Sequence, residues 1–417
     1  MNILVLGSGG RECAIVDSLS RCRRADTVYA MPGNGGIRNS IPGSPTDKEA
    51  VLAACRRYDI GLCCVTPDDP LAVGMVDHLE ANGIPCFGPT QAAARIESSK
   101  VFSKALMEKY GIPTAKARSF DRLDEALAYI EDQSFPIVVK ADGLALGKGV
   151  VIAKDKAEAQ AALHDMMEAH RFGQAGSRVL IEEFLTGPEV SILSFTDGHT
   201  IVPMVSSMDH KRAYDGDEGP NTGGMGTVAP NPYYTEDVAD ECMERIFLPT
   251  IRAMEAEGCP FRGCLYFGLM LTAQGPKVIE YNARFGDPET QVVLPLLEGD
   301  LLEIMLATRE GRLKDVSFSF SSDAACCVVM ASAGYPGSYE KGKEITIDDG
   351  LEEKLFIAGA VQKDGRLITS GGRVLGLTAR AATLPEAMAK AYEGVSKIHF
   401  AGAFFRHDIG RKALEAK

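Results

Sequence analysis

The residues best suited to metal and phosphate chemistry lie close together in one segment, residues 280–289. An apolar run precedes this segment and predicts a strand, in which Glu280 and Asn282 would point to the same face. A carboxylate and an amide oxygen suit a Mg²⁺ ion that is held jointly with phosphates, and Arg284 suits a carboxylate or an acyl phosphate. A salt-bridged strand end explains any one of these residues, but it explains the whole set poorly.

A glycine-rich loop follows another predicted strand and begins at Lys140. Gly143, Gly147 and Gly149 let backbone amides approach phosphate oxygens, and Lys148 adds a second positive charge. The loop lacks the Gly-Lys-Ser/Thr of a Walker A motif, and a strand rather than a helix follows it. The pattern therefore predicts a hairpin that folds over a nucleotide, and a flexible β-turn is the alternative.

Two further regions carry weaker signals. Residues 182–185 end a predicted strand, which offers backbone groups to an adenine edge, and Glu189 is placed to bind ribose hydroxyls. Solvated acidic residues are the alternative there. Residues 209–212 and 221–226 combine basic side chains with a glycine-rich loop whose amides can bind an anion. His210, taken alone, is best explained as a surface histidine.

The first glycine-rich loop, Gly7-x-Gly9-Gly10, matches a dinucleotide-binding fingerprint only in part. Glu12 stands where the third glycine is required, and Asp26 precedes the second predicted strand instead of ending it. The pattern therefore disfavours a nicotinamide site. Two alternatives stay open, a phosphate held by amides at a strand-to-helix turn and a tight turn without a ligand.

Short apolar strands alternate with helical patterns over residues 1–90, which predicts a doubly wound parallel sheet. Ligand loops should then follow the carboxyl ends of its strands. Helices are expected at 48–57, 71–81, 99–110, 123–131, 156–170, 237–257 and 384–397. Hairpin strands are expected at 263–272 and 277–282, and residues 208–232 are expected to form a long polar loop.

The composition is that of a globular protein, because 45% of the 417 residues are hydrophobic and 24% are charged. No apolar run reaches the roughly 18 residues of a membrane helix, and the N-terminus lacks a signal-peptide pattern, so we expect a cytoplasmic protein. The net charge of −13 disfavours nucleic-acid binding. The eleven cysteines include no CxxC pair, which indicates reduced thiols.

In order and spacing, these segments resemble the glycinamide ribonucleotide synthetases, also called phosphoribosylamine–glycine ligases. The resemblance covers essentially the whole chain, and residues 219–226 and 282–290 are its most specific parts. It implies an α/β protein with an N-terminal doubly wound parallel-sheet domain, an ATP-grasp domain with a mobile lid, and a small mixed α/β C-terminal domain. The implied boundaries are 1–99, 100–315 with the lid at about 116–188, and 316–417.

The resemblance also implies that glycine is ligated to 5-phosphoribosylamine with ATP and Mg²⁺ or Mn²⁺, in purine biosynthesis. A transient contact with the enzyme that supplies the amine is a further implication. The implied ATP-binding residues are Lys100, Lys140, Gly143, Gly147, Lys148, Gly149, Glu182, Phe184, Leu185 and Glu189. The implied substrate-binding residues are Gly9, Gly10, Arg11, Gly33, Asn34, Asn221, Thr222, Gly223 and Gly224. The implied metal ligands are Glu280 and Asn282, and the implied catalytic residues are Arg284, Lys211 and Asp209.

The chain departs from the family pattern at two places in the N-terminal region. Cys13 stands where the family usually has histidine, and Thr66-Pro67-Asp68 replaces the usual Gly-Pro-Glu. Both departures bear on phosphoribosylamine binding rather than on the chemistry of ATP. A thiol at position 13 is expected to be neutral in the complex and to act mainly as a small space-filler.

Three other functions are considered. One is another ATP-grasp carboxylate–amine ligase with different substrates. A nucleotide-binding regulatory subunit is disfavoured, because binding alone does not need Arg284 beside the metal pair. A dehydrogenase is disfavoured by the incomplete fingerprint.

Overall fold

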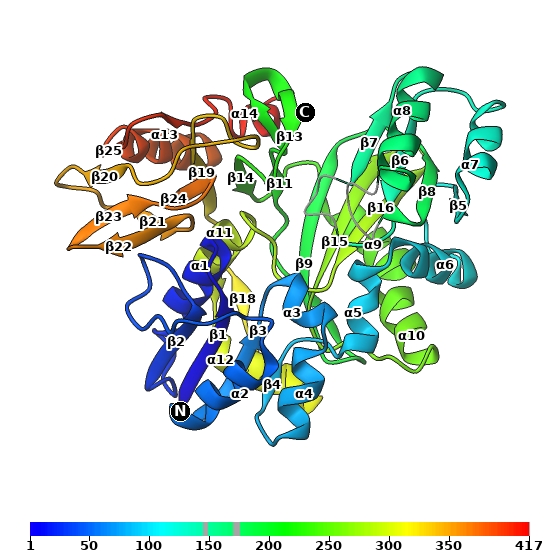
Figure 1. Ribbon diagram of the computed structural model, residues 1–417. Helices are drawn as coiled ribbons and strands as arrows, with labels where there is room; N and C mark the ends of the chain where they lie inside the picture. The colour runs from blue at the N-terminus through cyan, green and yellow to red at the C-terminus, as the bar shows by residue number, and fades with distance from the viewer. Residues whose placement is uncertain (145–148, 170–175, 417) are drawn as a thin grey trace.

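The computed structural model describes residues 1–144, 149–169 and 176–416, and its elements form several sheets with helices packed around them (Figure 1). The loop residues Gly147 and Lys148 lie outside the described residues. Among the described residues, none of the helices has the length and apolar character needed to cross a membrane.

The N-terminal region is a parallel four-stranded sheet in the order β2-β1-β3-β4, which confirms the predicted doubly wound sheet. Its strands are buried because they are apolar along their length. Asp47 begins the predicted helix at 48–57 by accepting a hydrogen bond from the amide of Ala50 at 3.0 Å. The elements are β1 (Asn2–Gly7), α1 (Gly10–Leu19), β2 (Thr27–Pro32), α2 (Lys48–Arg57), β3 (Ile60–Val65) and β4 (Cys86–Phe87).

Two helices differ from the prediction. The expected helix at 71–81 is divided into α3 (Asp68–Ala72) and α4 (Met75–Ala81), because Gly74 between them has a φ of 79°, in the left-handed region. Helix α5 (Gln91–Ser98) was not predicted and runs directly into α6 (Lys100–Tyr110). Ser99 separates them and accepts a hydrogen bond from the amide of Phe102.

An antiparallel sheet in the order β5-β8-β6-β7 follows, with helices α7 and α8 packed against it, and residues 116–188 that contain it are called the lid here. Its hydrophobic cluster consists of residues between 120 and 181 only, as far as the structure describes the chain. The elements are β5 (Ala117–Phe120), α7 (Leu123–Ile130), β6 (Ile137–Ala141), β7 (Val150–Ala153), α8 (Lys156–Met167) and β8 (Val179–Glu183).

A second antiparallel sheet, in the order β10-β9-β15-β16, carries the metal-type segment at the end of its last strand. The predicted helix at 237–257 is continuous but contains a π-helical turn at Met243–Phe247. The elements are β9 (Glu189–Thr196), β10 (Ile201–Pro203), α9 (Glu236–Cys242), α10 (Leu248–Ala256), β15 (Gly263–Thr272) and β16 (Gly275–Asn282). The predicted hairpin of β15 and β16 is confirmed.

The expectation of a long loop at 208–232 was wrong in part. Four short strands lie in it, namely β11 (Met208–Asp209), β12 (Arg212–Tyr214), β13 (Glu218–Asn221) and β14 (Gly226–Ala229). Strand β14 pairs with β19 (Ala324–Ser332), so this segment is built into the sheet β11-β14-β19-β24-β21 of the C-terminal region. Within the described part of the chain, strands β12 and β13 pair only with each other.

The C-terminal region completes that sheet and adds a smaller one in the order β22-β23-β20-β25. Helix α13 (Leu384–Val395) packs on β19 and β24 and confirms the helix predicted there. The other elements are α11 (Thr290–Val293), β17 (Leu297–Glu298), α12 (Leu301–Glu310), β18 (Ser319–Phe320), β20 (Glu344–Ile347), β21 (Lys354–Ile357), β22 (Ala360–Lys363), β23 (Arg366–Thr369), β24 (Arg373–Ala381), β25 (Ile398–His399), β26 (Ala403–Phe404) and α14 (Arg411–Leu414).

One hydrophobic cluster joins the regions outside the lid. It contains Ile3 and Val5 of β1, Phe195 of β9, and Cys327 and Val329 of β19. The N-terminal sheet, the second antiparallel sheet and the C-terminal sheet therefore share a core, whereas the lid has its own.

Candidate functional site

Glu280, near the end of β16, lies among four positively charged groups. The ammonium of Lys211 is 3.5 Å from its carboxylate. Burial by itself would raise the pKa of Glu280, but the charges of Lys211, Lys140, Lys100 and Arg284 lower it to about 2. The carboxylate is therefore ionised at neutral pH, and the cations around it exceed it in number.

Lys140, at the end of β6, is held by a carboxylate that the sequence analysis assigned to a different task. Glu182 is buried and contacts the ammonium groups of Lys140 at 2.7 Å and Lys104 at 3.0 Å. Lys140 also donates to the carbonyl of Ile279 at 3.1 Å, which connects the lid to β16. Because both carboxylate oxygens of Glu182 are paired with lysines, the backbone of this strand end is the part left to contact an adenine edge. Lys104, a buried residue of α6, was not predicted as part of the site, because no motif in the sequence includes it.

The start of the glycine-rich loop is docked on the first turn of α6. Lys100 donates to the carbonyl of Gly143 at 2.9 Å, and the side chain of Asp142 accepts the amide of Val101 at 2.8 Å. At the other end of the loop, the carbonyl of Gly149 accepts the amide of Ala141 at 2.8 Å. Lys100, Gly143 and Gly149 are thus brought near Lys140.

The strand end at Glu182–Glu183 continues into the partly exposed side chains of Phe184 and Leu185. Glu189 begins β9, and its carboxylate lies 3.7 Å from the ammonium of Lys211. Burial lowers the pKa of Lys211, and Glu280 and Glu189 raise it by more, so that Lys211 stays charged. Lys211 therefore connects the predicted ribose-binding carboxylate with the predicted metal ligand.

Arg284 is oriented by a residue that the sequence analysis missed. Its guanidinium contacts Glu97 at 2.9 Å and donates to the side-chain oxygen of Asn282 at 3.1 Å. The carboxylate of Glu97 also accepts the amide of Ala283 at 2.7 Å. Glu97 comes from α5, the helix that was not predicted, so only the structure brings it to β16.

Asp209 lies next to the same strand end but in a more acidic environment. Burial and the nearby charge of Glu289 raise the pKa of Asp209 well above its usual range. Gly224 has a φ of 109°, and a Cβ there would lie 2.6 Å from a carboxylate oxygen of Asp209. The close approach of the loop to Asp209 therefore requires glycine at this position.

The predicted anion-binding amides donate within the protein. Gly223 donates to the hydroxyl of Tyr335 at 3.2 Å, and Gly224 donates to the hydroxyl of Thr222 at 3.0 Å. Thr222 donates to the carbonyl of Lys211 through its amide at 2.7 Å and its hydroxyl at 2.9 Å. Asn221 ends β13 and pairs with Arg212. His210 is buried rather than exposed, so its interpretation as a surface histidine was wrong.

The N-terminal loop is closed by Glu12. Its carboxylate accepts the amide of Gly9 at 2.6 Å and the hydroxyl of Thr66 at 3.0 Å. A bound dinucleotide would need both this amide and the space that the Glu12 side chain fills. The glutamate in place of the third glycine therefore argues against a dinucleotide site. The guanidinium of Arg11 donates to the carbonyl of Phe285 at 3.0 Å, so this loop meets the end of β16.

Asn34 joins the N-terminal loops to the C-terminal region. Its side-chain amide donates to the carbonyls of Ser8 at 2.9 Å and Ile357 at 2.7 Å. Gly33 has a φ of 71°, and a Cβ there would overlap the side chain of Ser40. Gly10 is packed equally tightly against Gln291. These residues therefore hold the loops together, and the same loops lie at the carboxyl ends of β1 and β2.

Cys13 is buried in a small apolar cluster with Ala30, Ile37 and Phe356. Burial raises the pKa of its thiol to about 11. The prediction of a neutral, space-filling thiol is consistent with this environment.

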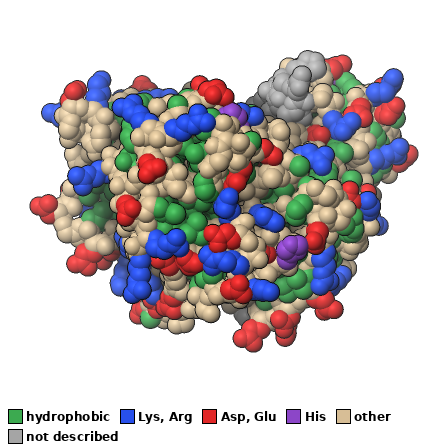
Figure 2. Space-filling model, turned by 90° about the horizontal axis from the view of Figure 1, so that it is seen from below, with side chains coloured by type: hydrophobic (Ala, Val, Ile, Leu, Met, Phe, Trp, Pro, Cys, Tyr) green, Lys and Arg blue, Asp and Glu red, His purple; other side chains and the backbone are tan. Residues whose placement is uncertain are grey.

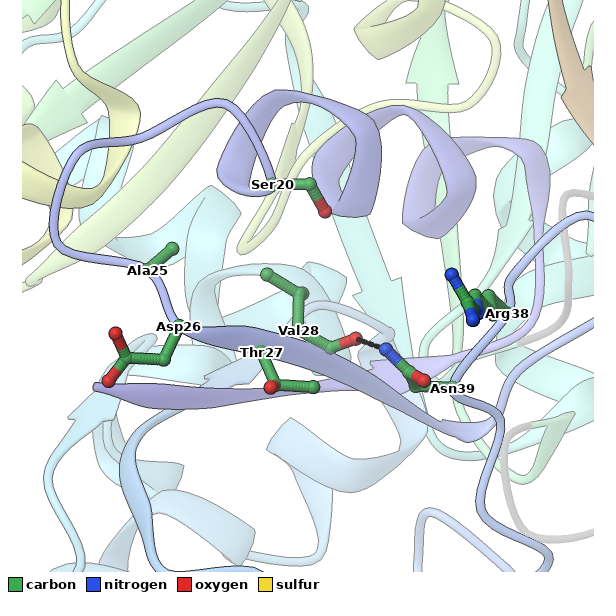
Figure 3. Close-up of a pocket in the computed structure, with 7 residues that line it drawn as sticks. All are labelled: Ser20, Ala25, Asp26, Thr27, Val28, Arg38 and Asn39. Atoms are coloured by element: carbon green, nitrogen blue, oxygen red, sulfur yellow. Dashed lines mark hydrogen bonds between the residues drawn. The ribbon is translucent and has the colours of Figure 1, made fainter.

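A separate pocket of about 290 Å³ lies beside edge strand β2 (Figure 3). It is lined by Ser20, Ala25, Asp26, Thr27, Val28, Arg38 and Asn39. Because Thr27 and Val28 begin β2, the pocket lies where the strand starts. The loops described above follow the carboxyl ends of the strands, at the other end of the sheet. None of the predicted site residues lines it.

Comparison with known proteins covers almost the whole chain. Family-level sequence models described as phosphoribosylglycinamide synthetase match residues 1–97 (N domain), 98–290 (ATP-grasp (A) domain) and 325–412 (C domain). Phosphoribosylamine–glycine ligase of Listeria monocytogenes is 48% identical, over 99% of this chain and 100% of that protein. The corresponding ligase of Caldanaerobacter subterraneus is 46% identical, over 98% and 99%.

Solved structures give the same result. The crystal structure of phosphoribosylamine–glycine ligase from Thermotoga maritima superposes with a TM-score of 0.86 at 36% identity, covering 98% of this chain and 100% of that one. The biotin carboxylase domain of Hydrogenobacter thermophilus 2-oxoglutarate carboxylase has a TM-score of 0.76 at 14% identity, over 97% and 91%. At that identity, the second likeness shows the fold alone.

Proposed function

The chain belongs to the phosphoribosylglycinamide synthetase family, and from this membership we propose how its residues carry out the family's reaction. It catalyses the ATP-dependent ligation of glycine to 5-phosphoribosylamine, through glycyl phosphate, to give glycinamide ribonucleotide, ADP and phosphate. This reaction belongs to purine biosynthesis. The fold is an ATP-grasp fold flanked by an N-terminal parallel-sheet domain and a mixed C-terminal domain.

The observation that supports these roles best is the charge around Glu280. Lys100, Lys140, Lys211 and Arg284 all act on one ionised carboxylate, so four cationic side chains converge on the end of β16. The phosphates of a nucleoside triphosphate bring several negative charges that such a group of cations can bind. The lysines stay close to one another because Glu182 and Glu189 neutralise part of their mutual repulsion.

The family uses ATP with a divalent metal, and we propose Glu280 and Asn282 as its protein ligands, with Mg²⁺ or Mn²⁺ as the ion. Over the described residues, no group of three or more His, Cys, Asp or Glu side chains could hold a metal ion. Two protein ligands completed by phosphate oxygens and water fit an ion of this kind. When bound, it would neutralise charge that develops on the transferring phosphoryl group.

The chemistry requires positioning more than covalent participation by the protein. A glycine carboxylate oxygen attacks the γ-phosphorus of ATP, the bond from that phosphorus to ADP breaks, and glycyl phosphate forms. The amine nitrogen of phosphoribosylamine then attacks the carbonyl carbon, phosphate leaves with the electron pair of the C–O bond, and the nitrogen loses a proton. We assign Arg284 and Lys211 to the developing negative charge, because both are held charged beside β16.

We assign Asp209 to the second step, in which the nitrogen of phosphoribosylamine loses a proton. Its raised pKa makes it a better proton acceptor than an ordinary aspartate, and it lies on the strand next to Lys211. Asn221, Thr222, Gly223 and Gly224 are proposed to contact glycine. Their amides would have to exchange the internal partners described above for the substrate.

The amine substrate is proposed to bind at the carboxyl ends of β1 and β2, through Gly9, Gly10, Arg11, Gly33 and Asn34. The contact of Arg11 with Phe285 places this loop against the segment that carries Arg284. A nucleophile bound there would face the acyl phosphate across the boundary of the two regions.

We propose that ATP lies between the lid and β16, with the ATP-binding residues predicted from the sequence, and that the domain boundaries are 1–99, 100–315 and 316–417. Lid closure over 116–188 would exclude water from glycyl phosphate. Positive and negative side chains are interspersed on the face shown in Figure 2, as expected of a protein that binds small molecules rather than nucleic acid. A cytoplasmic location and a transient contact with the enzyme that supplies phosphoribosylamine are part of the proposal.

The test is ADP release measured with glycine and phosphoribosylamine, each omitted in turn. Release should require both substrates. Equal release with alanine or aspartate in place of glycine would indicate another carboxylate–amine ligase, and binding of ATP without release under any combination would indicate a regulatory subunit.

A further inference from the structure

Strand β12, the turn Asp215–Asp217 and strand β13 form a hairpin over residues 212–221, which is called the substrate hairpin here. Lys211 precedes its first strand, Asn221 ends its second strand, and Thr222 follows directly. These are residues for which we propose contacts with glycine and the phosphoryl group, so the inference rests on that part of the proposed function.

The substrate hairpin has little support of its own. As far as the structure describes the chain, its strands pair only with each other, and the side chains of its turn are not buried. A single two-stranded hairpin is marginally stable in water. Lys211 and Thr222 lie between this hairpin and the paired strands β11 and β14, so their placement depends on what the hairpin contacts as well as on that pairing.

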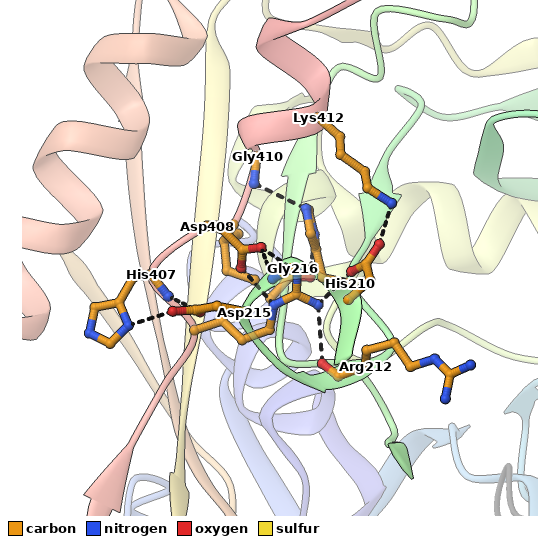
Figure 4. A network of polar contacts seen from close by, with 12 residues as sticks. His210, Arg212, Asp215, Gly216, His407, Asp408, Gly410 and Lys412 are labelled. Carbon is orange, nitrogen blue, oxygen red and sulfur yellow. Dashed lines mark hydrogen bonds and ion pairs between the residues drawn. The ribbon is translucent and has the colours of Figure 1, made fainter. Parts of the chain in front are cut away.

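The C-terminal segment, residues 406–412, makes that contact (Figure 4). Arg406 is 1% exposed and bonds the two carboxylate oxygens of Asp408, each at 2.8 Å. Its remaining nitrogen, Nη1, contacts the hairpin at two points: the carboxylate of Asp217 at 2.8 Å and the carbonyl of Arg212 at 3.1 Å. One guanidinium thus holds both the turn and the first strand of the hairpin.

Other residues of the C-terminal segment also bond the turn of the hairpin. Asp408 accepts the amide of Gly216 at 2.8 Å, His407 bonds Asp215 through its amide at 2.7 Å, and Lys412 pairs with Asp217. Both carboxylates of the turn and the amide of Gly216 are therefore paired with residues about two hundred positions later in the chain.

A second tie holds the base of the hairpin. The ring of His210 donates through Nδ1 to the carbonyl of Gly226 at 3.2 Å and accepts the amide of Gly410 through Nε2 at 3.1 Å. His210 lies between Asp209 and Lys211, both proposed catalytic residues. The C-terminal segment thus fixes the hairpin at its tip and at its base.

We propose that the C-terminal segment positions the substrate hairpin for catalysis, with Arg406 and Asp408 as positioning residues that do not touch substrate. The planar fork of Arg406 bonds Asp408 and Asp217 at once, which favours one arrangement of the turn on the C-terminal segment. Here that geometry determines where Lys211 and Thr222 stand relative to Glu280, and an error of about 1 Å in such positioning is costly to catalysis.

The test uses Arg406→Lys, which keeps the charge but loses the forked geometry, and Asp408→Asn, which nearly keeps the shape. Arg380→Lys is the control, because Arg380 pairs with Asp323 in the same region without contacting the hairpin. Full-length proteins are compared well below their unfolding temperatures. The readouts are kcat and KM for glycine, KM for ATP, and hydrogen exchange of residues 212–221.

We expect both test variants to lose at least about tenfold in kcat/KM for glycine, with KM for ATP within about twofold of wild type. Exchange of the hairpin amides should accelerate in these variants and not in Arg380→Lys. If Arg406→Lys does not fold, Asp408→Asn decides the matter. Faster hairpin exchange with unchanged glycine kinetics would overturn the proposal, as would an equal loss in all parameters that follows the loss of folded protein.

Lys211→Met separates this inference from the function on which it rests. If Lys211→Met loses glycine-dependent turnover while Arg406→Lys and Asp408→Asn retain it, the positioning role is wrong and the site assignment stands. If Lys211→Met also retains it, the assignment of the hairpin to glycine is wrong, and the positioning role falls with it.

Discussion

Glu280 is the carboxylate on which Lys100, Lys140, Lys211 and Arg284 act together at the end of β16. Strand β15 supplies no acidic side chain to share the task, because residues 264–271 contain neither aspartate nor glutamate. Lys211 and the other cations would repel one another more strongly without it. Glu280 is therefore the residue at which loss of charge should matter most.

Replacing Glu280 with glutamine keeps the shape and removes the charge. We expect kcat to fall by at least about 10²-fold, a loss comparable to that of one preorganised charge stabiliser. Glu241→Gln, which removes a carboxylate paired with Arg245 on the outer helix, is the control. Steady-state turnover at saturating Mg²⁺ measures the effect, and near wild-type turnover would refute the assigned role. Because the pKa of Glu280 is about 2, its loss should not shift the pH profile near neutrality.

Cys13 tests whether the departure from the family pattern has a catalytic meaning. Its thiol is buried against Phe356 and stays neutral at physiological pH. Cys13→Ser should change the KM for phosphoribosylamine by less than about tenfold, the equivalent of one ordinary hydrogen bond. The KM values for ATP and glycine should hardly change. A hundredfold loss of kcat at unchanged amine KM would show instead that Cys13 takes part in the chemistry.

At the scale of elements, the lid has the features of a body that moves. Its hydrophobic cluster is its own, and polar contacts connect it to the rest, such as Lys140 to Ile279 and Lys277 to Glu183 at 3.1 Å each. ATP bound between Lys140 and Glu280 would add a connection across the same boundary. We therefore expect hydrogen exchange in β6 and β7 to slow with saturating MgATP, whereas exchange in α12 stays unchanged.

Mass spectrometry of exchanged peptides measures this difference. We expect the same protection in the glycine-rich loop over residues 142–149, of which 145–148 lie outside the described residues. Unchanged exchange in β6 and β7 on saturation with nucleotide would rule out the proposed closure.

The elements also show what the sequence could reveal. Capped, periodic segments such as α2 and α6 were predicted within a residue or two. Helix α5 was missed because it is short and directly adjoins α6, although Thr90 caps it by accepting the amide of Ala93. Strands β11 and β14 were missed because they are short, and β14 pairs with β19 about one hundred residues later.

The residues of the candidate site divide in the same way, into those that one segment of sequence reveals and those that only the fold brings together. Residues within one segment, such as Glu280, Asn282 and Arg284, could be recognised from their spacing. Glu97 and Arg373 could not, because each reaches the site from an element that is remote in the chain. Arg373 donates to the carbonyls of Gly223 at 2.6 Å and Asp287 at 2.8 Å, which no periodicity indicates.

For the whole molecule, the C-terminal region is part of the catalytic body rather than an appendage. Strand β19 contributes Cys327 and Val329 to the cluster that also contains Ile3 and Phe195. The C-terminal segment then returns to the substrate hairpin through His210 and Arg406. Any condition that breaks the His210 contact should therefore be seen in the stability of the protein as well as in its activity.

Protonation of His210 is such a condition. Burial is the main cause that lowers its pKa to about 4, with a further contribution from the charge of Arg406. An unfolded histidine has a pKa near 6.5, so between about pH 6.5 and pH 4 the unfolded chain binds a proton that the folded protein excludes. Stability from this group is fully present above about pH 6.5 and is lost as the pH falls towards 4. Over that range the free energy of unfolding should fall by up to about 3 kcal/mol on account of His210.

Denaturant unfolding of wild type and His210→Gln at a series of pH values isolates this contribution. The difference in unfolding free energy between the two proteins should shrink by that amount from pH 7 to pH 4, whatever its size at pH 7. His164→Gln, which alters an exposed histidine beside Glu168, should keep the wild-type pH dependence. Wild-type and His210→Gln curves that stay parallel from pH 7 to pH 4 would mean that His210 has the same pKa in the folded and the unfolded protein. The contact of its neutral Nε2 with the amide of Gly410 would then make no net contribution to holding the C-terminal segment on the base of the substrate hairpin.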